Sequence, residues 1–179
     1  MLYEMYAPKM KGLCFRYVGD SETVKDIVQD GFIKVFSNIR QFDGKGSFDG
    51  WIKRIFINTA ISHIRKHNKK NKTTSFEDVD ESNLIESETL QSDNQIDINI
   101  ENLEKLSAEL SEAELLSALQ RIPENFRTVF NLFCIEHIKH EEIAKILDIE
   151  ITTSRTRLVR ARGMIQKELM AICIEKRTQ

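Results

Sequence analysis

Four arginines stand within eight residues near the end of the chain, in the segment TSRTRLVRAR at residues 153–162. An arginine can donate two parallel hydrogen bonds to a guanine edge or a phosphate, so a row of them on one helix face indicates nucleic-acid contact. At 100° per residue, Leu158, Ala161 and Ile165 form a stripe to be buried, opposite a basic face. The residues expected on or beside that outer face are Thr153, Arg155, Thr156, Arg157, Val159 and Arg160. For this segment alone, a solvated amphipathic helix is the alternative.

The preceding segments are suited to hold that helix in place. HEEIAKILD, at residues 140–148, predicts a short helix that ends near Asp148. Its buried residues would be Ile143, Ala144 and Leu147. A tight turn and a longer helix from about Thr152 would complete a helix-turn-helix. Upstream, residues 123–137 predict a further helix with Pro123 in its first turn, where the missing N–H costs nothing. Its buried face would consist of Phe126, Val129, Phe130, Phe133 and Cys134.

A second basic surface is predicted in the first half of the chain, on a helix that follows the loop QFDGKGSF. Gly44 and Gly46 permit a tight loop, and Ser47 or Asp49 can cap the helix. The residues expected in its buried stripe are Trp51, Ile52, Ile55, Phe56 and Ile64. Beside them, Arg54, Asn58, Ile61 and Arg65 recur at helical spacing. The helix ends in Lys66, Lys69, Lys70 and Lys72, enough positive charge to follow a phosphate backbone.

The segment SETVKDIVQDGFIKVFSNI, at residues 21–39, predicts another amphipathic helix. The residues at core spacing are Ile27, Val28, Val35, Phe36 and Ile39. Asp26, Gln29, Asp30 and Lys34 point elsewhere. By itself this pattern is that of an ordinary helix with a solvated polar face.

The charged residues divide the chain into two basic segments and an acidic one between them. Residues 1–74 carry 14 Lys and Arg against 7 acids, residues 75–114 carry one Lys against 13 acids, and residues 115–179 carry 11 against 8. The net charge of −2 therefore hides two basic modules joined by an acidic segment that is too polar to build a core. With few Gly and Pro, the expected fold is all-α: two small helical domains, at residues 1–72 and 113–179, joined by a flexible acidic linker at 73–112.

Other features narrow the class of protein. No apolar run approaches the roughly 18–20 residues that cross a bilayer, and no signal peptide is evident, so we expect a cytoplasmic protein without membrane insertion. The three cysteines suit reduced core thiols. Cys134, His137 and His140 lack an evident fourth ligand, so we expect no metal. No nucleophile or acid–base couple is evident either, so we expect no cofactor and no enzyme activity.

Taken together, the motifs resemble the extracytoplasmic-function sigma factors of bacterial RNA polymerase. IPENFRTVF, HEEIAKILDI and TSRTRLVRAR match the family's C-terminal helix-turn-helix, which implies recognition of a minus-thirty-five promoter element. Departures include Asp148 at a turn usually made by Gly, and Glu150 where a capping Ser is usual, so that Glu150 or Thr152 must cap the helix. Ser154 replaces an inward Val, which we expect to loosen packing.

The N-terminal motifs resemble the same family. DIVQD resembles the helix that binds polymerase, which implies docking through Asp26, Gln29, Asp30 and Phe32 on the clamp helices of core RNA polymerase. GSFDGWIKRIFINTAISHIR resembles the segment that binds the melted minus-ten element. The residues implied there are Phe42, Asp43, Ser47, Phe48, Arg54, Asn58 and Arg65.

The resemblance implies three kinds of partner: core RNA polymerase, promoter DNA and an anti-sigma factor. The acidic linker would meet the positively charged polymerase channel and lower non-specific DNA binding. A free-standing helix-turn-helix transcriptional regulator, whose N-terminal helices dimerise or sense a signal, is the alternative function. It would have no need for the DIVQD helix followed by the GSF loop.

Overall fold

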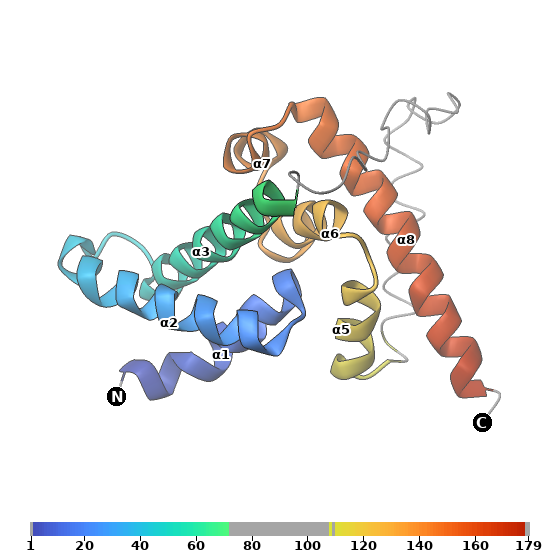
Figure 1. Cartoon of the computed structure of the whole chain (residues 1–179), viewed down its shortest axis with the longest axis horizontal. Helices are drawn as coiled ribbons and strands as arrows, with labels where there is room; N and C mark the ends of the chain where they lie inside the picture. Colours follow the sequence, from blue (N-terminus) through green and yellow to red (C-terminus); the bar gives the residue numbers. More distant parts are fainter. Residues whose placement is uncertain (1, 72–107, 109, 178–179) are drawn as a thin grey trace.

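The computed structural model describes residues 2–71, 108 and 110–177, and every regular element in them is a helix (Figure 1). The all-α expectation is therefore confirmed. The elements are α1 (Leu2–Val18), α2 (Ser21–Asn38), η1 (Ile39–Gln41), α3 (Phe48–Asn71), α5 (Glu112–Gln120), α6 (Glu124–Phe130), η2 (Asn131–Ile135), α7 (His140–Leu147) and α8 (Ile151–Arg177). Most of the expected acidic linker lies outside the described residues. None of the described helices is both long and apolar enough to span a bilayer.

Helices α1, α2 and α3 form the first module (residues 2–71). The Asp20 carboxylate caps α2 by accepting a hydrogen bond from the Thr23 amide at 2.8 Å. The helices cross tightly, because Gly31 of α2 lies against the buried Phe56 ring of α3. The Lys34 ammonium adds a hydrogen bond to the Thr59 hydroxyl at 3.0 Å, which fixes α2 against α3.

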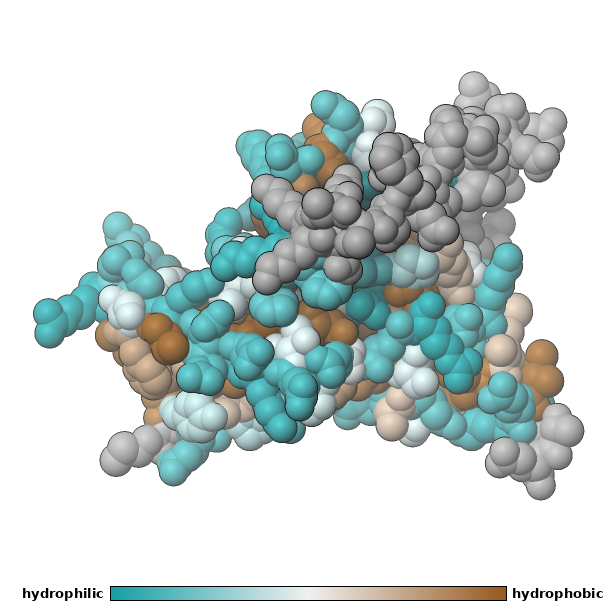
Figure 2. Space-filling view, viewed as in Figure 1, coloured by the Kyte–Doolittle hydropathy of each residue, from teal (hydrophilic) through white to brown (hydrophobic). Residues whose placement is uncertain are grey.

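Two residues expected in the core of α2 are on its surface instead. Phe36 is 51% exposed and Ile39 is 38% exposed. Tyr3 and Ile33 are exposed as well, and the final turns of α2 extend past the start of α3 (Figure 1). Figure 2 shows hydrophilic residues over most of the same face of the molecule, with a hydrophobic area over the left-hand part of α2 and others elsewhere, including the right-hand end of the molecule.

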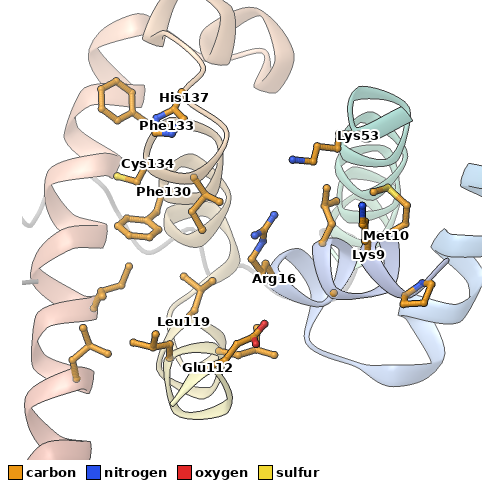
Figure 3. A pocket seen from close by; sticks show the side chains of 18 of the residues that line it. Lys9, Met10, Arg16, Lys53, Glu112, Leu119, Phe130, Phe133, Cys134 and His137 are labelled. Carbon is orange, nitrogen blue, oxygen red and sulfur yellow. The ribbon is translucent and has the colours of Figure 1, made fainter. Parts of the chain in front are cut away.

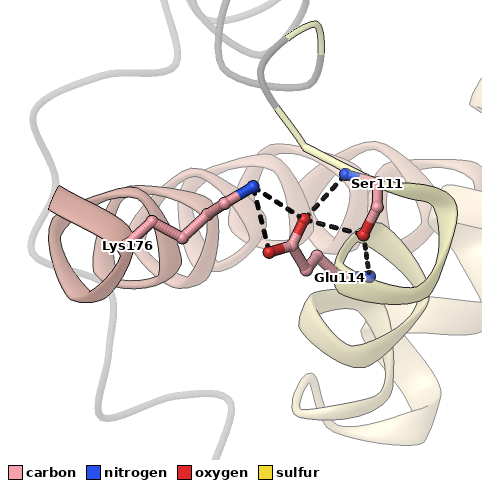
Figure 4. A network of polar contacts seen from close by, with 3 residues as sticks. All are labelled: Ser111, Glu114 and Lys176. Carbon is pink, nitrogen blue, oxygen red and sulfur yellow. Dashed lines mark hydrogen bonds and ion pairs between the residues drawn. The ribbon is translucent and has the colours of Figure 1, made fainter. Parts of the chain in front are cut away.

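The second module (residues 110–177) begins with a capping box on α5. The Ser111 hydroxyl accepts from the Glu114 amide, while the Glu114 carboxylate accepts from the Ser111 amide at 2.7 Å (Figure 4). Lys176, near the end of α8, forms an ion pair with Glu114 at 3.1 Å. Together, these groups lower the pKa of Glu114 to about 2, with the Ser111 hydroxyl as the largest cause. These contacts join the first turn of α5 to the last turn of α8.

The helix-turn-helix has the predicted turn. Asp148 adopts the left-handed conformation, with φ 56° and ψ 52°, and the Ile149 amide closes the turn on the Ala144 carbonyl at 3.1 Å. Helix α8 begins at Ile151, one residue before the expected start, and the Ser154 amide donates to the Glu150 carbonyl. Before α7, the chain forms a wide π-helical turn at η2, so the helix predicted over 123–137 is two shorter elements.

The two modules touch, and their apolar cores are continuous. Val129, Leu132, Ile143 and Leu158 of the second module belong to the same buried cluster as the core of α1, α2 and α3. A second cluster is formed by α5 and the later turns of α8. Helix α8 therefore packs against two different groups of helices along its length.

Candidate nucleic-acid interface

The first turns of α8 present the predicted outer face. Leu158, Ala161 and Ile165 are buried, as expected. On the other side, Arg155 and Val159 are exposed, while Thr153, Thr156, Arg157 and Arg160 are half-buried. The Thr156 hydroxyl donates to the Thr152 carbonyl at 3.0 Å, so in this state it serves its own helix. Arg155 is thus the arginine of the group with the freest access.

His140, the first residue of the HEEIAKILDI motif, holds α8 in place. Ser154 is fully buried, and its hydroxyl lies 2.9 Å from His140 Nδ1, on the first residue of α7. The His140 ring in turn stacks on Phe133 of η2, with ring centres 4.4 Å apart. Burial, and then the charge of Arg155, lower the pKa of His140, which favours a neutral ring. Ser154 therefore has a hydrogen bond at the position where the family has a valine, and the looser packing expected there stays a prediction.

The fourth arginine of the segment faces inward. Arg162 is 4% exposed, and its guanidinium lies 3.9 Å from the Cys134 sulfur and 5.8 Å from the centre of the Phe133 ring. Its Nε and Nη1 atoms have no hydrogen-bond partner. Arg162 belongs to the interior of the second module and contributes nothing to the outer basic face.

The loop before α3 has the shape expected of it. Gly44 and Gly46 have φ values of 75° and 101°, which side-chain-bearing residues rarely adopt. Asp43 is exposed, and its carboxylate accepts from the Lys45 amide at 2.9 Å. The exposed Ser47 hydroxyl accepts weakly from the Gly50 amide at 3.4 Å, so Ser47 caps α3.

Three aromatic rings gather beside this loop. Phe42 lies 5.2 Å from Phe48 and 5.7 Å from Trp51, and Phe48 stacks on Trp51 at 5.6 Å with the two planes 19° apart. All three are half-buried. Trp51 was expected in the buried stripe of α3, and it packs against the core while keeping part of its ring accessible. This aromatic cluster (Phe42, Phe48 and Trp51) offers π faces on which an unstacked base can lie.

The basic side of α3 is exposed but occupied. Arg54, Asn58 and Arg65 are exposed, whereas Ile61, expected beside them, is 3% exposed and belongs to the core. The Arg54 guanidinium forms an ion pair with Glu142 of α7. Arg65 donates a short hydrogen bond to the Ile146 carbonyl, also in α7. Both arginines of α3 thus contact the second module.

The polar face of α2 is partly as expected. Asp26, Gln29 and Asp30 are exposed, but Phe32 is 3% exposed. Phe32 packs its ring against Phe56 with centres 5.1 Å apart, so it cannot contact a partner directly. This corrects the expectation for Phe32. The exposed Phe36 lies one turn further along the helix and is the aromatic residue that this surface offers.

Two buried polar residues escaped the sequence comparison. Arg127 is 6% exposed and Asn131 is fully buried, both on the side of α6 and η2 that faces α1. No apolar periodicity marks them, so the pattern that finds core residues passes over them. Within the described ranges, no group of three or more His, Cys, Asp or Glu is placed to hold a metal ion.

The comparisons with known proteins agree with this arrangement. Residues 2–70 match the family model for sigma-70 region 2, and residues 112–165 match that for sigma-70 region 4. The chain is 30% identical over 172 residues to the ECF RNA polymerase sigma-E factor of Haemophilus influenzae, covering 96% of this chain and 87% of that one. It is 31% identical to the RNA polymerase sigma-H factor of Pseudomonas aeruginosa, covering 98% and 88%.

A solved structure agrees in fold. The sigma factor RpoE from Bartonella quintana, crystallised with the anti-sigma factor NepR, matches with a TM-score of 0.54, at 18% identity and over 94% of each chain. The chain thus combines two basic helices, α3 behind an aromatic loop and α8 in a helix-turn-helix, and sigma factors match it over nearly its whole length. The chain belongs to the extracytoplasmic-function sigma factors of bacterial RNA polymerase.

Proposed function

We propose that this protein binds core RNA polymerase and directs promoter-specific transcription initiation, without catalytic activity of its own. The observation that carries the proposal is that two sigma-70 regions, in family order, span a chain matched over nearly its whole length by sigma factors. The proposed division is a region 2 domain at residues 1–72, a linker at 73–112 and a region 4 domain at 113–179. The cytoplasm is the proposed location, since promoter DNA and polymerase are there.

The first module would open and hold the minus-ten element. Unstacking a base costs a few kcal/mol, and stacking on an aromatic platform returns about 1–3 kcal/mol per base. The aromatic cluster stands at the start of α3, where an extruded base would meet it, with Asp43 and Ser47 on the loop beside it. Arg54, Asn58 and Arg65 would follow the backbone along α3.

The second module would read the minus-thirty-five element. Thr153, Arg155, Thr156 and Arg160 would face the major groove, with Arg157 and Val159 at the edges of the same surface. Arg155 is exposed near the N-terminal end of α8. In a helix-turn-helix, the N-terminal residues of the second helix are the ones that contact bases in the major groove. Phosphate contacts would set the register, and base contacts the sequence.

The polar face of α2 would dock on polymerase. Asp26, Gln29 and Asp30 are exposed along it, and Phe36 and Ile33 add exposed apolar surface nearby. Exposed aromatic and apolar residues are enriched in the centre of protein interfaces, and polar residues form the rim around them. An anti-sigma factor is a further proposed partner, since the Bartonella quintana structure was determined with one.

Run-off transcription with purified core polymerase tests the proposal. Arg155→Ala should lose most promoter-directed transcript, while Lys167→Ala, which removes the same charge from a later exposed position of α8, should keep it. Asp30→Arg should weaken co-purification with core polymerase, with Glu22→Gln on the same helix as its control. If the wild-type protein neither co-purifies with core polymerase nor yields a promoter-dependent transcript, the proposal is refuted.

A further inference from the structure

A cavity of about 1030 Å³ is lined by residues of α1, α3, α5, α6, η2 and α8. In Figure 3, Arg16 and Lys53 extend into this space from α1 and α3, and Leu119 of α5 lies on the opposite wall. Pockets that hold small organic ligands typically have volumes of about 300–1,000 Å³. None of the residues proposed to contact DNA or polymerase is among the described residues that line this cavity. The cavity is therefore large enough for a small ligand and separate from the surfaces already assigned.

One side of the cavity is apolar. The side chains that form this apolar wall come from α5, α6 and α8 and are Leu115, Leu116, Leu119, Phe130, Ile165 and Leu169. Leu115, Leu116 and Phe130 are only half-buried, so the fold leaves part of their apolar surface uncovered. Because removing apolar surface from water is favourable, the apolar part of a ligand would be stabilised against this wall.

Arg162 also lines the cavity, and its positive charge has no anionic partner among the described residues. The side chain is 4% exposed, and its Nε and Nη1 atoms have no hydrogen-bond partner. The Cys134 sulfur, 3.9 Å away, is a weak acceptor, and burial raises the pKa of this thiol, which keeps it neutral. The Phe133 ring at 5.8 Å offers only a cation–π contact. A buried cation is costly without a counter-charge, so an anion in the cavity would supply the missing partner.

The position of Arg162 on α8 aligns its charge with the apolar wall. Ile165 and Leu169 lie three and seven positions later, so the three side chains share one stripe of the helix. At about 1.5 Å per residue, this stripe extends roughly 10 Å from Arg162 to Leu169. A medium-length alkyl chain, such as that of decanoate, would cover it.

The other charges around the cavity also favour an anion. Besides Arg162, the charged residues among its described lining are Lys9, Arg16 and Lys53 against Asp49 and Glu112. Arg16 is paired with Glu136 at 2.7 Å. Even without Arg16, the remaining cations outnumber the two acids, and a surplus of positive charge attracts anions.

We propose that this cavity is a binding site for an amphipathic organic anion, a medium-chain carboxylate. The carboxylate of the ligand pairs with the Arg162 guanidinium, since these two groups form strong charge-assisted hydrogen bonds. The alkyl chain lies along Ile165 and Leu169, against the apolar wall. This site is additional to the proposed function and does not depend on it.

Isothermal titration calorimetry of the full chain with sodium decanoate, below its micelle concentration, tests the site. Decanoate should bind saturably, with one site per chain. Sodium acetate, which has the carboxylate without the chain, should give no measurable binding, because it leaves the apolar wall uncovered. Decyltrimethylammonium, which has the same chain and the opposite charge, should bind about tenfold more weakly or less. Equal binding of decanoate and decyltrimethylammonium, or no saturable binding of decanoate, would overturn the proposal.

A matched pair of variants tests the role of Arg162. Arg162→Met removes the charge but keeps a long side chain, and it should weaken decanoate binding about tenfold or more. Lys167→Met removes a positive charge from an exposed position of the same helix that is not part of the lining, and it should bind as the wild type does. Circular dichroism shows whether both variants are folded. Equal affinities of the two folded variants would overturn the proposal.

A second pair decides the question if Arg162→Met does not fold. Lys53→Glu reverses the charge of an exposed residue that lines the cavity, and Lys25→Glu does the same at an exposed position of α2 outside the lining. Lys53→Glu should bind decanoate about two- to fivefold more weakly than Lys25→Glu, the range expected for one exposed charge. Equal affinities of these two variants would then overturn the proposal.

Discussion

Replacing Gly31 with Ala sets two opposing effects against each other. At an exposed position inside a helix, alanine is more favourable than glycine by about 1 kcal/mol. At Gly31, however, a Cβ would stand 2.5, 2.7 and 2.8 Å from three atoms of the Phe56 ring. Real Cβ contacts are never this short, so something must shift.

The Phe56 ring has no free space into which it could move to relieve these contacts. Phe56 is fully buried in α3 and packs edge-on against Phe32. Overpacking of a well-packed core typically costs about 1–3 kcal/mol, and three close contacts to one rigid ring belong at the upper end of that range. The clash should therefore outweigh the helix preference, leaving Gly31→Ala destabilised by about 1–2 kcal/mol.

Gly12 provides the matched control in the same module. It lies inside α1, and apart from its chain neighbours and the backbone of its own helix, no atom of the described residues comes within 4 Å of the position where its Cβ would be. Gly12→Ala should be stabilised by roughly 0.5–1 kcal/mol. Urea unfolding followed by circular dichroism would give both values, and the melting temperatures should move in opposite directions, by about 2–4 °C per kcal/mol. A Gly31→Ala protein as stable as Gly12→Ala would refute the tight crossing of α2 and α3.

Three further variants test other contacts. The pKa of the Glu114 carboxyl is lowered from 4.5 to about 2, so the ionised carboxylate stabilises the folded state above pH 4.5 and loses this effect as the pH falls towards 2. In Glu114→Gln, the melting temperature should therefore fall less than in the wild type between pH 4.5 and pH 2. The pKa of His140 is lowered in the folded state, so the unfolded state binds a proton more readily and wild-type stability should fall as the pH drops below about 6.5. In thermal unfolding at several pH values, His140→Asn should show less of this fall. Asp20→Ala should lower the melting temperature, while Asp20→Asn, which can still cap α2, should retain most of it.

The sequence allowed prediction of features that depend on neighbours along the chain. Apolar spacing located the inner stripe of α8, and the tolerance of Asp for a left-handed conformation anticipated the turn at Asp148. Paired glycines likewise anticipated the loop before α3. Each of these depends on backbone geometry within a few residues, which local pattern describes well.

Features set by distant neighbours were mispredicted or missed. Phe36 has core spacing but is exposed, while Phe32, one turn earlier, is enclosed by Tyr3 of α1 and Phe56 of α3. Ile61 shares its spacing with Arg54 and Arg65, yet it faces inward because the core of the first module reaches around α3. The partner of Ser154 lies 14 positions away in another helix, so no local rule identified the hydrogen bond that replaces an apolar contact.

Arg127 and Asn131 mark the physical difference between the two kinds of buried surface in this protein. The core of a permanent fold would be more stable with apolar residues at these positions, since burying a charge costs several kcal/mol of desolvation. At this contact, however, the end of α1 presents carbonyl groups, and the last four carbonyls of a helix have no partners within it. Arg127 and Asn131 donate hydrogen bonds of 2.8 Å to the Tyr17 and Arg16 carbonyls. The choice of polar residues at this buried contact is therefore explained by the helix end that they cap, at the cost of leaving Arg127 Nε and Asn131 Oδ1 without a hydrogen-bond partner.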